Sequence, residues 1–129
     1  MIFTATLPAQ DAGGADVVAL AGVYASAFYS GDTVTDVELV APPGFSVVTG
    51  DPNDNITINV RQLRNGVPIQ SFASLTVGEG TVLAPETPVS LPITAQPILR
   101  AGDVIDVQMQ QNGQGKAVGM GLNVSVFVS

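Results

Sequence analysis

Hydrophobic and polar side chains alternate with a period of two over much of this chain, which is the pattern of strands that bury one face. The clearest case is the segment 118–128, where every second residue is apolar: Val118, Met120, Leu122, Val124, Val126 and Val128. Residues 104–110 alternate in the same way, and the Gly-rich segment 111–115 separates the two. The pattern therefore predicts two strands that pair as a hairpin.

A second hairpin is predicted at Asn65-Gly66, because this pair suits positive φ at both central positions of a tight turn. The incoming strand alternates over residues 56–61, and apolar residues of the return strand follow the turn: Ile69, Phe72, Leu75 and Val77. Residues 33–41 predict a further strand, which ends at Pro42-Pro43-Gly44.

Two segments have weaker patterns. Residues 16–30 also place several apolar side chains on one helical face: Val17, Leu20, Ala21, Tyr24 and Phe28. The exposed face of such a helix would carry no charge between Val17 and Tyr29, so we interpret the segment as a buried strand. Residues 84–98 contain four prolines, which cannot donate to a ladder, and are expected to form edge strand and connection.

The patterns together predict eight or nine strands and no helix. Fourteen Gly and nine Pro, distributed along 129 residues, divide the chain into short segments joined by tight turns. We therefore predict an all-β fold, a single antiparallel β-sandwich or jelly-roll-like domain over residues 1–129. A chain of this length buries about two-thirds of its unfolded surface, so it needs no metal or disulfide to fold.

Composition then excludes several classes of function. The chain has no Cys, His or Trp, so it lacks a thiolate nucleophile, the commonest general base and the commonest metal ligand. Eleven acidic residues against four basic ones give a net charge of −7, which opposes binding to nucleic acid. A membrane helix needs about 20 consecutive apolar residues, and no such run occurs. The first eight residues lack the basic start of a secretory signal, so we expect synthesis in the cytoplasm.

Two motifs partly match ligand-binding loops, one for phosphate and one for calcium, and are better explained as turns. The segment 113–116 has the Gly-Lys of a phosphate-binding loop, but Gln110 stands where the motif needs Gly, and Ala117 where it needs Ser or Thr. The oxygen-rich loop 50–55 lacks the later Glu of a calcium loop, so we expect a turn closed by its own Asp and Asn side chains.

Paired carboxylates are the remaining candidate for catalysis. Asp36 and Glu38 lie two residues apart on a predicted strand and should share a face, but no cleft is indicated beside them. The single lysine, Lys116, lies in a Gly-rich turn that offers no means of lowering its pKa. We therefore expect no enzyme activity, no catalytic residues, no cofactor and no metal site.

The C-terminal third carries a resemblance to a known family. Residues 97–107 contain an Ala-Gly-Asp turn before a strand, in which Gly102 supplies the bend and Asp103 caps it, and a Gly-rich segment and a Val-rich strand follow. The opening, a short strand ending at Pro8 and then a segment with Gly22-Val23-Tyr24, is similar too. This pattern resembles the capsid decoration (cement or head-stabilising) proteins of tailed bacteriophages.

The resemblance implies a structural protein of the virion, bound to the outer surface of the head at capsomer junctions and stabilising the shell. Its implied partners are the major capsid protein and further copies of itself, with a trimer favoured. The residues expected to contact the capsid or a neighbouring subunit lie in the apolar N-terminal segment: Met1, Ile2, Phe3, Thr4 and Leu7. The alternative is that Ile2, Phe3 and Leu7 complete a sheet within one chain.

Two other functions fit the same fold. One is a tail or fibre-head module that contacts a host receptor. The other is a small carbohydrate-binding jelly roll, which would present exposed aromatic side chains; this chain has two Tyr and five Phe, most of them in predicted strands.

Overall fold

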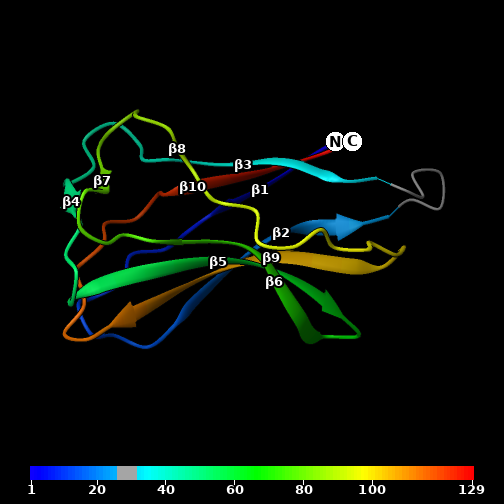
Figure 1. Ribbon diagram of the computed structural model, residues 1–129, viewed down its shortest axis with the longest axis horizontal. Coiled ribbons are helices and arrows are strands. Elements are labelled where there is room, and N and C mark those ends of the chain that lie inside the picture. Colours follow the sequence, from blue (N-terminus) through cyan, green and yellow to red (C-terminus); the bar gives the residue numbers. More distant parts are fainter. Residues whose placement is uncertain (26–31) are drawn as a thin grey trace.

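The computed structural model describes residues 1–25 and 32–129, which contain ten strands and no helix (Figure 1). The strands are β1 (Ile2–Thr6), β2 (Val17–Tyr24), β3 (Val34–Val40), β4 (Val48–Thr49), β5 (Asn55–Arg64), β6 (Val67–Thr76), β7 (Val82–Leu83), β8 (Val89–Ser90), β9 (Asp103–Asn112) and β10 (Asn123–Val128).

Two four-stranded sheets pack against each other as a sandwich, which confirms the predicted all-β fold (Figure 1). One sheet has the order β1-β10-β3-β8 and the other the order β2-β9-β5-β6, while β4 and β7 form a small separate pair. The count exceeds the expected eight or nine because β4 and β7, with two residues each, lie in segments for which no strand is predicted.

The strands pair in a nested order that begins at one tight turn. β5 pairs with β6, β4 with β7, β3 with β8, β2 with β9 and β1 with β10, all antiparallel. At the centre of this order Asn65 and Gly66 have φ of 54° and 77°, so the predicted hairpin turn is confirmed. The chain thus forms one long hairpin that is rolled into two layers, which is the organisation of a jelly roll.

The predicted hairpin between the last two long strands is wrong. β9 pairs with β2 and β5, whereas β10 lies in the other sheet and pairs with β1 and β3. The chain crosses between the sheets over residues 113–122, so the predicted strand 118–128 is regular only in β10. Val118 forms an isolated bridge with Gln10, Met120 is 73% exposed, and Gly121 has φ of 103°.

The interpretation of residues 16–30 as a buried strand is wrong about burial, although part of the segment is a strand. β2 is a strand as expected, and residues 26–30 lie outside the described part of the chain. Because β2 is at the edge of its sheet with one face toward solvent, its outward side chains are exposed and only its inward ones pack on the core. Both sets are apolar, so the sequence pattern could not show that one face is open.

The remaining segments lie as expected. β3 falls within the predicted strand 33–41, and β8 is a short edge strand within the proline-rich segment 84–98. One apolar core fills the space between the sheets, with β5 and β9 contributing fully buried side chains: Ile56, Ile58, Val60, Ile105, Val107 and Met109. Both ends of the chain lie together, and the amino group of Met1 donates to the Val128 carbonyl at 2.9 Å (Figure 1).

Candidate functional site

The N-terminal segment splits into buried and exposed side chains. β1 pairs with β10 within the same chain, and Phe3 and Leu7 are 7% and 1% exposed. A Cβ atom at Gly22 would lie 2.9 Å from the Phe3 ring, so this ring closes the sandwich edge between β1 and β2. Of the predicted contact residues, Met1, Ile2 and Thr4 remain exposed and available to a partner.

The outward face of β2 carries three exposed apolar side chains, Val18, Leu20 and Val23, which we call the β2 row. Their exposed fractions are 48%, 66% and 51%. A β-bulge between Leu20 and Gly22 shifts the register with β9 by one residue, and Val23 therefore points to the same side as Leu20 despite being three residues away. The bulge makes the row continuous along an edge strand.

The middle of that sheet face is polar, and its side chains bind one another in what we call the amide ladder, whereas Val104 and Leu63 beside Val23 are apolar. The Gln108 and Gln110 amides donate to Asp16 Oδ2 at 3.2 and 3.4 Å. The Asn59 amide donates to Gln110 Oε1 at 2.9 Å and accepts a hydrogen bond from the Ser74 hydroxyl at 2.8 Å. The ladder runs from Asp16, which precedes β2, across β9 and β5 to Ser74 on β6.

Two bidentate ion pairs continue the polar network at the other end of β5. Arg61 donates to both carboxylate oxygens of Asp106, each at 2.8 Å, across the β5–β9 register. Arg64 likewise donates to both carboxylate oxygens of Asp103, at 2.9 and 2.8 Å. The Asp103 side chain is only 2% exposed and also accepts a hydrogen bond from the buried amide of Gln62 at 2.8 Å.

Asp103 closes the turn that precedes β9. Its backbone N–H donates to the Arg100 carbonyl at 2.9 Å, its carboxylate accepts from the Arg100 N–H at 2.9 Å, and Gly102 has φ of 91°. The predicted roles of Gly102 as bend and Asp103 as cap are confirmed. The hydrogen bonds from Arg64, then those from Arg100 and Gln62, lower the pKa of Asp103 from 3.8 to about 2.

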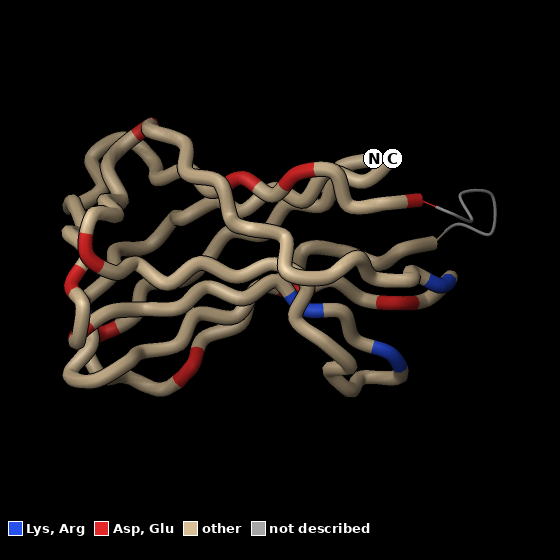
Figure 2. The backbone as a smooth tube through the Cα atoms, in the orientation of Figure 1, with Lys and Arg blue, Asp and Glu red and all other residues tan. Residues whose placement is uncertain are grey.

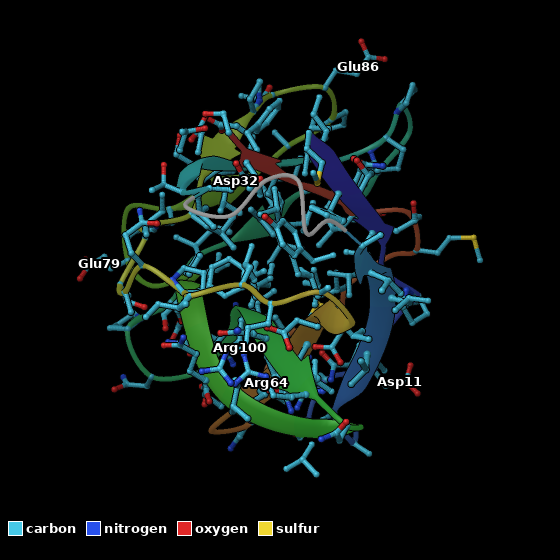
Figure 3. All side chains as sticks on the ribbon, turned by 90° about the vertical axis from the view of Figure 1, so that its right-hand side faces the viewer. Asp11, Asp32, Arg64, Glu79, Glu86 and Arg100 are labelled. Carbon is cyan, nitrogen blue, oxygen red and sulfur yellow. The ribbon has the colours of Figure 1, made fainter. Side chains whose placement is uncertain are left out.

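Three of the four basic residues gather at this end, where the blue segments of Figure 2 lie in the right-hand half of the view. Arg64 and Arg100 line one shallow hollow together with Gln70, Ile98 and neighbouring side chains. Figure 3 looks onto this end and shows the two arginines close together at the base of the sandwich. Arg61 and Arg64 are each paired with an aspartate, so among these three residues the unpaired positive charge is that of Arg100.

The two turn motifs have structural roles. The Gln111 side chain accepts hydrogen bonds from the Lys116 and Gly13 N–H groups at 2.7 and 3.2 Å, which holds the 113–116 loop as a turn, as expected. Asp51 accepts from the N–H groups of Asn53 and Asp54 at 2.8 and 2.7 Å, the expected self-closing turn. These same bonds, first that from Asp54, lower the pKa of Asp51.

The two acidic residues considered as a pair both lie on β3. Asp36 and Glu38 share the outer face of β3, as predicted, and Glu38 accepts a hydrogen bond from the Ser90 hydroxyl at 2.7 Å. Within residues 1–25 and 32–129 no three acidic side chains are grouped as metal ligands. In the same residues there is no helix long and apolar enough to span a membrane.

Comparison with known proteins adds no assignment. No protein-family model matches the chain, and searches of curated proteins and of solved structures give no significant match. The structure itself defines the class of this protein as a jelly-roll β-sandwich. Its exposed surfaces are the basis for the proposed function.

The β2 row and the basic hollow are the two surfaces that sequence reasoning missed. The sequence pattern did not reveal the β2 row because the inward and outward residues of β2 are equally apolar. The basic hollow had a signal, since Arg64 and Arg100 are rare cations in an acidic chain, but only the fold brings the end of β5 beside the turn before β9.

Proposed function

We propose that this protein is a non-enzymatic structural module that binds the outer surface of a bacteriophage head and stabilises the shell. The observation that carries the binding role is the β2 row, an exposed apolar strip on an edge strand of a rigid sandwich. Apolar side chains that are half exposed in the free protein gain free energy when a partner covers them, on the order of 1 kcal/mol each. The head as partner is supported by the resemblance of the C-terminal third to capsid decoration proteins.

The charge of the protein supports a position on the outside of the shell. A net charge of −7 is repelled by packaged DNA, whereas an outer surface requires solubility and protein contact. The major capsid protein is the proposed partner, at junctions where several capsid subunits meet. Further copies of the chain, with a trimer favoured, are proposed to meet through the exposed N-terminal residues Met1, Ile2 and Thr4.

The test is co-sedimentation of the purified protein with heads of its phage, followed by cryo-electron microscopy of the pellet. We expect density at regular lattice positions and weaker binding of the variant Leu20→Ser, by about fivefold. The matched control is Met120→Ser, which removes a side chain of similar exposure, 73% against 66%, from the loop before β10. Recovery of the protein on tails, or in neither fraction, would refute the head as partner.

The oligomeric part of the proposal has its own readout. Sedimentation equilibrium of the free protein is expected to give a trimer mass, and Ile2→Asp is expected to give monomers, because it places a charge on the exposed face of β1. A wild-type monomer at all concentrations would exclude the trimer while leaving the head-binding test unaffected.

A further inference from the structure

The hollow at the basic end combines one uncompensated charge with two exposed isoleucine side chains in a mostly polar lining. Arg64 and Arg100 face it from the end of β5 and from the turn before β9 (Figure 3). Ile98 and Ile69, also in its lining, are 79% and 46% exposed. An exposed isoleucine side chain and a guanidinium group each gain free energy from contact with a ligand of matching chemistry.

The charges in the hollow differ in their availability. Arg64 is bound on two nitrogens by Asp103, so its charge is neutralised by a partner within the chain. The Arg100 side chain makes no hydrogen bond or ion pair with any residue that the structure describes, and its hydrogen bonds to Asp103 come from its backbone N–H and carbonyl groups. The hollow therefore offers a net charge of one unit, carried by Arg100.

The amides in the wall are held in place by bonds within the protein. Gln70 donates to Gln62 Oε1 at 2.8 Å, and Gln62 donates to the Ile98 carbonyl at 3.0 Å. Gln96 is bound twice to the backbone of Val34, at 3.0 and 2.8 Å. These bonds fix the wall before any ligand arrives, so binding would order little more than the Arg100 side chain.

We infer that this hollow binds one carboxylate of an acidic protein segment, with an apolar neighbour of that carboxylate resting on Ile98 and Ile69. A guanidinium group matches a carboxylate in two parallel hydrogen bonds, and a single charge suits a monovalent group. A polyanion such as nucleic acid is disfavoured, because the remaining surface of the protein repels it. This second contact goes beyond the head-binding role and does not depend on which surface covers the β2 row.

The test uses the isotope-labelled full chain and a defined peptide, acetyl-Ala-Leu-Glu-Leu-Ala-amide. Nuclear magnetic resonance titration is expected to shift the Arg100 side-chain signal and the amide signals of Ile69 and Ile98 in a saturable way. The same peptide with Gln in place of Glu is expected to bind at least tenfold more weakly, because it loses the charge-assisted hydrogen bonds.

A matched pair of variants separates the site from general charge attraction. Arg100→Gln and Lys116→Gln each remove one positive charge, and Lys116 lies in the loop after β9 rather than in the hollow. We expect R100Q to lower the affinity for the peptide about tenfold and K116Q to change it less than twofold. Equal effects of the two variants, equal binding of the Gln peptide, or a larger response to inorganic phosphate than to the peptide would each overturn the inference. Because no heads are used, failure here leaves the proposed function standing.

Discussion

The outer face of the β2-β9-β5-β6 sheet contains two regions with opposite chemistry, the amide ladder and the β2 row. On β9, β5 and β6 polar side chains bind one another, in the amide ladder and in the Arg61–Asp106 pair. On β2 the outward side chains are apolar, and about half or more of their surface is exposed. A polar group that already has a partner gains little by exchanging it, whereas an exposed apolar group gains by being covered. The ladder therefore stabilises the sheet, and the β2 row provides the free energy of binding.

The largest effect on stability is expected at Asp103, where the polar network is most buried. Asp103→Ala would leave Arg64, Gln62 and the Arg100 N–H without their shared acceptor, and we expect the free energy of unfolding to fall by about 3 kcal/mol. Urea denaturation measures it. Asp11→Ala, at an exposed carboxylate, is the control and should change stability by less than about 0.5 kcal/mol.

The next effect is a dependence on pH. Because the pKa of Asp103 is about 2 when folded and 3.8 ordinarily, the folded state binds this proton less readily than the unfolded state. The ionised carboxylate therefore contributes about 2 kcal/mol above pH 4, which is lost as the pH falls from 4 toward 2. Denaturation midpoints of wild type and Asp103→Asn, compared between pH 6 and pH 2, should converge in acid. A constant difference would show that Asp103 does not titrate as described.

The amide ladder is tested by a smaller change. Asn59→Ala removes the amide that joins β9 to β6, and we expect a loss of about 1 kcal/mol in the free energy of unfolding with unchanged binding to heads. The measurement is urea denaturation together with co-sedimentation. Weakened binding without loss of stability would place the ladder in the contact surface and contradict the division of roles.

The smallest effect on stability is expected in the β2 row. Leu20→Ser, which is proposed to weaken binding, should change the free energy of unfolding by less than about 0.5 kcal/mol, since Leu20 is 66% exposed. Thermal and urea denaturation of L20S against wild type measure this. A loss as large as that of N59A would mean that the row is part of the fold rather than a binding surface.

The sequence predicted the local features of this fold and missed the relations between distant strands. Alternation showed which residues of β5 and β9 face inward, and Asn65-Gly66 identified a turn from two residues. Alternation does not say which strand is the partner, so the pairing of β9 with β10 was assumed from their closeness along the chain. The Arg61–Asp106 pair joins residues 45 positions apart through strand register, and no local pattern encodes it.

The nested pairing of the strands also leads us to expect a particular order of folding. β5 and β6 need to close only a two-residue turn, while β1 and β10 bring together Thr4 and Ser125, which are 121 positions apart. Since distant pairings cost more chain entropy, we expect the hairpin at Asn65-Gly66 to form first and the outer pairs to follow, over milliseconds to seconds. Substitutions in the turn should slow refolding, and substitutions in β1 should mainly speed unfolding.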